Sequence, residues 1–283
     1  MKLVYFNDYR LGVLRGNDVV DVTSTVQKIP HTGPGYLMNG LIERWAEYRG
    51  QLEKAAAAGK GVPVSQVKLR PPLPKPVNVD CMAVNYMEDG TRKAPAPINA
   101  FHKSPGCIVG HGDTMVLPDI PSNIFEGEAE LALVIGKRAS NVKAADAMQY
   151  IFGYVNFIDG SARGVKPEGN TFYQMKSRAS FAPIGPYLVT ADEMDVRNLK
   201  MTARINGEVW TDSSTAGRQF SFEDLIVHVS QSETIYPGEL WGSGTTSGGS
   251  GLELDRWLKP GDVVELEIEG IGILRNRIER RQI

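Results

Sequence analysis

The hydrophobic positions at the start of the chain predict short strands followed by one amphipathic helix. The opening run LVYFNDYRLGVLRGNDVVDVT contains apolar segments separated by Asn-Asp and Gly-Asn-Asp turn signals, which is typical of a small meander. From Leu37 to about Ala58, apolar residues recur at helical spacing before a glycine stop. The stretch KLRPPLPKPVN has too many fixed φ angles for a regular element. We therefore predict a small N-terminal α+β domain with its linker over residues 1–75, and a second domain over 76–283.

The remaining pattern is mostly that of strands. Apolar runs suited to strands are separated by irregular stretches rich in Gly, Pro and Ser; these runs are VDCMAV, AELALVIG, YVNFID, LKMTARING and VVELEIEG. Two helices interrupt them, one over residues 144–152 and one that begins at a capping box formed by Ser221 and Asp224. Because strands and helices do not alternate regularly, we predict an α+β fold that is predominantly β.

Composition and charge exclude several classes of protein. With 42% hydrophobic and 23% charged residues, the 283-residue chain can bury a full hydrophobic core. The 31 Lys and Arg residues balance 33 Asp and Glu residues, so no overall field favours nucleic acid or an acidic membrane surface. The first residues contain no apolar stretch long enough for a signal or a membrane span, so we expect a cytoplasmic location. Cys81 and Cys107 lack metal or redox spacing, which indicates free buried thiols.

Three acidic residues carry the chemistry that the pattern indicates. Glu128 and Glu130 enter a strand whose continuation is apolar, and residues i and i+2 of a strand point to one face. Two neighbouring carboxylates repel each other unless water or a cation lies between them, and a hard divalent ion prefers such oxygen ligands. Asp159 ends another apolar strand and is followed by small residues. Taken alone, these acids fit either a divalent-metal site or a solvated strand edge.

From about Val77 to the end of the chain, several motifs in order resemble the fumarylacetoacetate hydrolase superfamily. They are FHKSPGCIVG, GEAELALVIG, GYVNFIDGSAR, KSRASFAPIGPYLVT, the RINGE hairpin, the Gly-Thr turn and LKPGDVVELEIEGIGILRNRI. The resemblance implies a mixed β-roll core, a homodimer, and a metal on Glu128, Glu130 and Asp159. The implied metal is Mg²⁺ or Mn²⁺, with Ca²⁺ as an alternative, and the implied substrate is a small 2-oxo or 2,4-dioxo acid that chelates it.

Further site residues follow from the same resemblance. Lys176 matches a catalytic lysine that faces metal and substrate, although an ordinary surface lysine is the alternative. Lys103, in a Phe-x-Lys pattern, is expected to line the pocket or to have a structural role. Gly244 and Thr245 match a turn that contacts the substrate carboxylate, with a plain glycine turn as the competing interpretation. Glu253 resembles a glutamate that orients a catalytic histidine.

The chain departs from the family where many smaller members carry Asn-Tyr-x-x-His-x-x-Glu. After Asn85 and Tyr86, this sequence has Asp89 at the histidine position and Arg92 at the glutamate position. We interpret Asp89 as a candidate general base, provided that burial raises its pKa, and Tyr86 and Arg92 as candidate substrate-binding residues. The alternative for residues 87–97 is a lid rich in charge, Gly and Pro.

Three functions remain open at this point. We expect metal-dependent hydrolysis of a carbon–carbon bond in an acylpyruvate-like or fumarylacetoacetate-like acid, or its decarboxylation. The second is isomerisation or tautomerisation of an unsaturated oxo-acid, or dehydration of a sugar acid, for which a single carboxylate base suffices. The third is a metal-dependent ligand-binding protein that lacks the histidine–glutamate pair. All three involve a small molecule and neither nucleic acid nor membrane.

Overall fold

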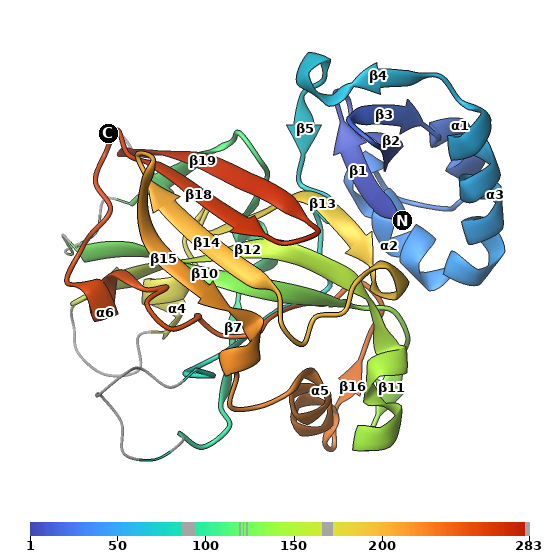
Figure 1. The fold of residues 1–283 in the computed structure, drawn as a ribbon. Coiled ribbons are helices and arrows are strands. Elements are labelled where there is room, and N and C mark those ends of the chain that lie inside the picture. Colours follow the sequence, from blue (N-terminus) through green and yellow to red (C-terminus); the bar gives the residue numbers. More distant parts are fainter. Residues whose placement is uncertain are drawn as a thin grey trace.

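Two β-sheets, joined by short helices, make up most of the fold (Figure 1). The computed structural model describes residues 1–86, 94, 96–118, 120, 122, 124–165 and 172–280. The predicted α+β class with predominant β-structure is confirmed. Among the helices in these ranges, none is both long enough and apolar enough to cross a bilayer.

The larger sheet contains strands from residues 2 to 242, whereas the C-terminal strands lie in the second sheet. Across the described residues its strand order is β4-β3-β2-β1-β13-β12-β10-β17-β6-β7, with β5 beside β1 and β8 beside β13. These strands are Lys2–Phe6 (β1), Arg10–Arg15 (β2), Asp18–Asp21 (β3), Gly61–Pro63 (β4), Leu69–Arg70 (β5), Val79–Met82 (β6), Ala100–Lys103 (β7), Ile108–Val109 (β8), Ile124–Ile135 (β10), Ile151–Arg163 (β12), Ala182–Thr190 (β13) and Leu240–Gly242 (β17). Because β1 pairs with β13, the N-terminal strands extend the sheet that carries β10 and β12.

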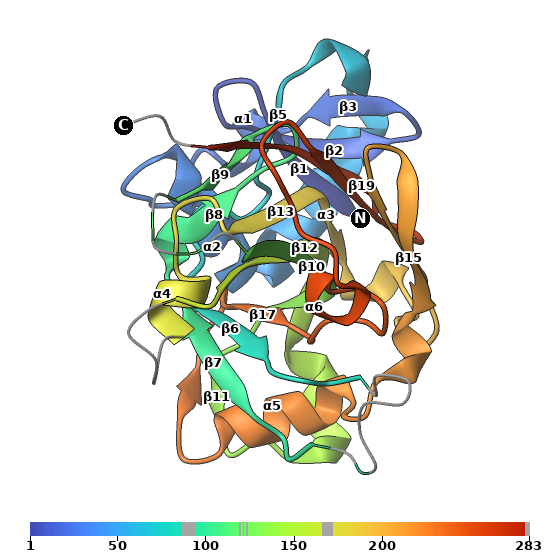
Figure 2. The ribbon, with the colours of Figure 1, turned by 90° about the vertical axis from the view of Figure 1, so that its left-hand side faces the viewer.

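A second sheet packs against the long strands of the first (Figure 2). Its order is β15-β14-β18-β19-β9, and a separate pair is formed by β11 and β16. These strands are Thr114–Leu117 (β9), Lys200–Ile205 (β14), Glu208–Ser214 (β15), Val263–Ile268 (β18), Gly272–Arg280 (β19), Ala139–Ser140 (β11) and Thr234–Ile235 (β16). The buried Asn156 side chain of β12 donates to the carbonyls of Leu266 and Gly272 at 3.0 and 2.7 Å, and so links the two sheets.

The helices are short and lie around the sheets. The α-helices are Thr23–Val26 (α1), Leu37–Glu43 (α2), Trp45–Ala58 (α3), Phe172–Lys176 (α4), Phe222–Ser230 (α5) and Gly251–Leu254 (α6). The 3₁₀ helices are Pro34–Tyr36 (η1), Val64–Gln66 (η2), Pro105–Cys107 (η3), Ala144–Tyr150 (η4), Ala191–Glu193 (η5) and Thr215–Gly217 (η6). The capping box of Ser221 and Asp224 is confirmed at the start of α5.

Two of the predicted helices differ from those in the structure. The single helix predicted from residue 37 to 58 is divided into α2 and α3, because Arg44 at their junction leaves helical geometry with φ −106° and ψ 20°. The helix predicted over 144–152 is the 3₁₀ helix η4, and residues from Ile151 onward belong to strand β12. In both cases the apolar spacing indicates the buried face, but not the local backbone conformation.

The N-terminal helices share a buried cluster with the large sheet. Leu41 of α2 and Leu52 of α3 belong to the same cluster as Val155 and Phe157 of β12. Cys81 and Cys107 are buried free thiols, as predicted. The division into domains 1–75 and 76–283 stays a prediction.

The close approach of β12 to β13 gives a stability prediction. A Cβ atom on Gly153 would lie 2.3 Å from the Val189 carbonyl oxygen, so a methyl group there must displace the backbone of β13. We expect Gly153→Ala to lower the free energy of unfolding by about 2 to 3 kcal/mol. Gly50→Ala is the control, because nothing lies within 4 Å of its Cβ position in α3. Equal urea denaturation midpoints for wild type and Gly153→Ala would contradict the packing.

Candidate active site

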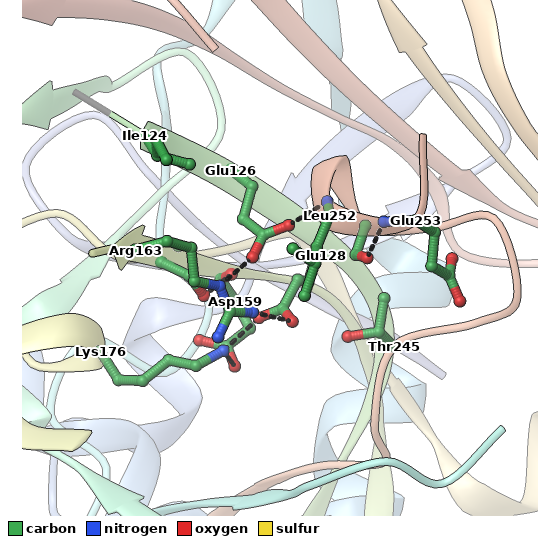
Figure 3. Close-up of polar contacts among 12 residues, drawn as sticks. Ile124, Glu126, Glu128, Asp159, Arg163, Lys176, Thr245, Leu252 and Glu253 are labelled. Carbon is green, nitrogen blue, oxygen red and sulfur yellow. Dashed lines mark hydrogen bonds and ion pairs between the residues drawn. The ribbon is translucent and has the colours of Figure 1, made fainter. Parts of the chain in front are cut away.

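Four buried acids lie together on the paired strands β10 and β12, and Figure 3 labels three of them, Glu126, Glu128 and Asp159. Glu126, Glu128 and Glu130 share one face of β10, because side chains two apart in a strand point the same way. Asp159 of β12 stands directly opposite Glu128 in the antiparallel register. The exposed fractions of Glu126, Glu130 and Asp159 are each 1%, and that of Glu128 is 8%. Carboxylates at this depth need compensating charge or hydrogen bonds. These four residues are called the acid centre below.

Two buried lysines supply part of that charge. Lys176, the last residue of α4, donates to Asp159 Oδ2 at 2.7 Å and also contacts Glu128 Oε2. Lys103, the last residue of β7, contacts Asp159 Oδ1 and donates to the carbonyl of Gly160 at 3.0 Å. Asp159 is therefore held between two ammonium groups that come from different elements.

The two lysines lower the pKa of Asp159 much more effectively than that of Glu130. Burial raises the pKa of Asp159, but Lys103 and Lys176 outweigh this effect, so the pKa lies below its usual value. Burial also raises the pKa of Glu130, and repulsion from Asp159 and Glu128 adds to it, so the pKa lies well above its usual value. For Lys176, burial lowers the pKa, but attraction to Asp159 and Glu128 raises it overall.

Glu130 accepts hydrogen bonds from neutral groups. The backbone N–H of Gly244 donates to its Oε2 at 3.1 Å, and the Thr245 hydroxyl donates to its Oε1 at 3.4 Å. Gly242 provides the necessary space, since a Cβ atom there would lie 2.5 Å from Glu130 Oε2. Within the described residues, no ion pair of Glu130 is present. The predicted Gly-Thr turn thus contacts the member of the acid centre that most lacks a cationic partner.

Glu126 and Arg163 are absent from the residues predicted from sequence. The Arg163 guanidinium contacts Glu126 Oε1 through Nε and donates from Nη2 to Glu128 Oε1 at 3.0 Å. A signal for both residues exists in the chain. Glu126 stands two positions before Glu128, and Arg163 four positions after Asp159, so both share the face of their strand with a predicted acid.

Among the described residues, no hydrogen bond or ion pair joins the acid centre to the other residues predicted from sequence. Tyr86 is 2% exposed, and burial raises its pKa to about 12, with the charge of Glu130 among the further causes. Glu253 lies in α6, to one side of the acids in Figure 3, and its N–H donates to Ser250 Oγ at 3.2 Å. Asp89 and Arg92 lie outside the described residues, so their roles stay predictions.

The donor set suits a hard cation, although the side chains are not arranged around one. As they stand, no three carboxylate, imidazole or thiol groups in the described part of the chain could hold a metal ion. Lys176 instead bridges Glu128 and Asp159. With all four carboxylates ionised, the three cationic side chains, those of Lys103, Arg163 and Lys176, would leave one negative charge. Oxygen ligands with excess negative charge are what Mg²⁺ and Mn²⁺ prefer.

The four histidines of the chain all lie in described residues, and none has a hydrogen bond or ion pair with the acid centre. His102 is next to Lys103 in β7 but points to the opposite side, where it pairs with Asp80 at 2.6 Å. His31 contacts the carbonyl of Ile29 at 2.8 Å. His111 accepts from a backbone N–H at 3.3 Å, and His228 lies in the last turn of α5.

Comparisons with known proteins agree on one family. The family model described as fumarylacetoacetate (FAA) hydrolase C-terminal matches residues 78–279. The chain is 36% identical over 271 residues to oxaloacetate tautomerase Fahd2a, mitochondrial, of Rattus norvegicus, covering 93% of this chain and 84% of that protein. It is 35% identical over 278 residues to oxaloacetate tautomerase FAHD2A, mitochondrial, of Homo sapiens, covering 95% and 87%. A solved structure of maleylpyruvate hydrolase from Sphingobium sp. SYK-6, with manganese(II) and pyruvate, has a TM-score of 0.88 and 28% identity over the full length of both chains.

A second pair of buried acids lies on the opposite side of β6 from the acid centre. Asp80 is 6% and Glu239 2% exposed. Burial raises the pKa of Asp80 to about 6, although the contact with His102 acts in the opposite direction. Glu239 accepts from Trp241 Nε1 at 3.2 Å and from Asn78 Nδ2 at 3.3 Å. Burial, with repulsion from Asp80 as the next cause, raises the pKa of Glu239 to about 7.

This shift makes stability depend on pH. The folded-state pKa of Glu239 is above its unfolded value, so the cost of burying its charge is absent below the unfolded pKa, small at pH 5, and complete once pH has risen through about 7. We expect Glu239→Gln to raise the free energy of unfolding at pH 8 by roughly 1 to 2 kcal/mol, with little effect at pH 5. Urea denaturation at both pH values measures this, with the exposed Glu233→Gln as control. An equal change at both pH values would show that the charge is not responsible.

Proposed function

The chain belongs to the fumarylacetoacetate hydrolase family, and on that premise we propose that it is a divalent-metal-dependent tautomerase. It interconverts the keto and enol forms of a small 2-oxo acid with a second carboxylate, of which oxaloacetate is the test compound. Two relatives named as oxaloacetate tautomerases support this choice, because each is at least 35% identical over more than nine-tenths of the chain. The reaction moves one proton between carbon 3 and the 2-oxygen and breaks no carbon–carbon bond.

The observation that carries the proposal is the lack of an imidazole at the acid centre. Hydrolysis needs a base that activates water, and the family pattern supplies it as a histidine held by a glutamate. Here His102, the histidine next to a residue of the centre, has a side chain that is 71% exposed and paired with Asp80. A tautomerisation needs only one group that takes and returns a proton. The candidate for that group is still Asp89, which is a prediction from the sequence.

We assign the metal to Glu128, Glu130 and Asp159. When bound there, a divalent cation would supply charge that holds the 2-oxo and carboxylate oxygens of the substrate. The residual negative charge of the centre and the raised pKa of Glu130 support this assignment, because both follow from crowded carboxylates without enough positive charge. With a divalent ion the centre would carry a net positive charge, which favours an anionic substrate.

The cationic residues take different parts in this proposal. Lys176 remains protonated because its pKa is raised, so it stabilises negative charge on the substrate and does not act as a base. Lys103, whose side chain is fully buried, orients Asp159. Arg163 is 23% exposed, the most accessible cation of the three, and we assign it to the second carboxylate of the substrate.

Cleavage of an acylpyruvate is the second candidate function, and sequence analysis favours it. The full-length similarity to a maleylpyruvate hydrolase at 28% identity supports it. The homodimer and the cytoplasmic location also stay predictions; the two tautomerases compared here are named as mitochondrial proteins.

The activity is tested by following the loss of enol absorbance after the oxaloacetate enol is added to the protein with Mn²⁺ or Mg²⁺. We expect faster decay than without protein, with no release of carbon dioxide or pyruvate. Lys176→Met should lower kcat by about 100-fold or more, since it removes the charge that stabilises the developing oxyanion. Acylpyruvates and unsaturated oxo-acids are tested in parallel. Release of pyruvate from an acylpyruvate, without any enol conversion, would favour hydrolysis instead.

Metal binding is tested separately by titration with Mn²⁺, monitored by electron paramagnetic resonance. We expect Glu130→Gln to weaken Mn²⁺ binding by at least about 10-fold, because one anionic oxygen ligand is lost. Glu267→Gln is the control, since Glu267 pairs with Arg204 on the surface of β18. Equal Mn²⁺ affinity in wild type and Glu130→Gln would remove Glu130 from the ligand set.

A further inference from the structure

Glu126 is a fully engaged carboxylate at the edge of the acid centre. It is 1% exposed, and each of its oxygens has a different partner. Oε1 contacts Arg163 Nε, while Oε2 accepts from the backbone N–H of Leu252 at 2.9 Å (Figure 3). Glu126 thus connects the guanidinium on β12 to the first turn of α6, two segments that are about ninety residues apart in the chain.

Arg163 pairs with two carboxylates, those of Glu126 and Glu128, which differ in their relation to the proposed metal. Both carboxylates have protein donors on each oxygen, but Glu128 is a proposed metal ligand and Glu126 is not. A divalent cation on Glu128 would weaken its attraction for Arg163, because the cation neutralises the carboxylate and repels the guanidinium. The contact with Glu126 does not depend on the metal. In the loaded enzyme, Glu126 is therefore the group that keeps Arg163 in position.

The same carboxylate holds α6 close to β10. Its bond to Leu252 N lies next to the cap in which Ser250 Oγ accepts from Glu253 N at 3.2 Å. Gly251 has no room for a side chain, since a Cβ atom would lie 3.1 Å from Glu126 Cβ and 2.2 Å from the Arg256 carbonyl oxygen. The start of α6, which carries the predicted site residue Glu253, is thus packed directly onto Glu126.

We propose that Glu126 is a positioning residue that fixes Arg163 for binding the second carboxylate of the substrate and keeps the start of α6 beside it. This inference rests on the proposed function. Glu126 acts through Arg163 and touches neither metal nor substrate. A glutamine in its place has one acceptor oxygen, so it cannot serve both Arg163 Nε and Leu252 N. An aspartate keeps the charge and both oxygens but is shorter by one methylene group.

The kinetic test compares Glu126→Gln and Glu126→Asp with the surface control Glu267→Gln, which removes a similar arginine–glutamate pair at 2.9 Å. With oxaloacetate and saturating Mn²⁺, we expect Glu126→Gln to raise KM by about 10-fold with little change in kcat, because a charge-assisted contact is lost. Glu126→Asp should recover part of the affinity, and Glu267→Gln should match wild type. A fall in kcat at unchanged KM would overturn the proposal.

Two further measurements do not depend on turnover. The first is calorimetric binding of malate, which has the second carboxylate of oxaloacetate, to the Mn²⁺-loaded variants, in which Glu126→Gln should bind more weakly. The second is the rate at which phenylglyoxal modifies Arg163, followed by peptide mass spectrometry in Mn²⁺-loaded protein. We expect faster modification in Glu126→Gln than in wild type or Glu267→Gln, because the guanidinium has lost its fixed partner. Unchanged malate affinity together with an unchanged modification rate would overturn the proposal.

These readouts separate failure of the inference from failure of the proposed function. If wild type does not convert the oxaloacetate enol, the tautomerase assignment fails, while malate binding and phenylglyoxal modification still test the role of Glu126. If Glu126→Gln does not fold, Glu126→Asp takes its place: intermediate values of malate affinity and modification rate support the proposal, and wild-type values overturn it.

Discussion

Burial of four carboxylates within two paired strands is the constraint on which the rest of the structure depends. An unpaired charge in a protein interior costs several kcal/mol, so the acids of β10 and β12 require cations that reach them from other segments. Lys103 comes from β7, Lys176 from α4 and Arg163 from the end of β12 itself. The arrangement of these elements around the two strands follows from this requirement as much as from the packing of apolar side chains. The remaining negative charge is what suits the centre to a divalent ion.

Local patterns in the sequence predict much of the fold. The apolar run after Glu130 gives the buried half of β10, and Ser221 with Asp224 gives the start of α5, because both signals act over a few residues. The break at Arg44 and the 3₁₀ geometry of η4 are not predictable in this way, since helical spacing of apolar residues is compatible with either backbone. Sheet order is also beyond local patterns. The pairing of β17 with β6 and β10 joins segments more than a hundred residues apart.

The residues of the site could also be predicted only where the signal is local. Side-chain alternation places Glu128 and Glu130 on one face, and applied one step further it would have included Glu126. Which cation meets which acid depends on contacts between distant segments, such as Lys176 with Glu128 across 48 positions. The neutral donors on Glu130 come from a turn 114 positions away. Residue spacing contains no information on such pairs, and family motifs indicate the residues without their partners.

The place of β17 between β10 and β6 also determines when the centre can exist during synthesis. β17 spans Leu240–Gly242, and the Gly244 N–H that caps Glu130 follows it directly. A nascent chain that ends before this point has made all four acids but lacks the strand that lies between β6 and β10. On the ribosome, the sheet that carries the acids therefore remains incomplete, with an exposed edge, until residues 240–242 have been translated.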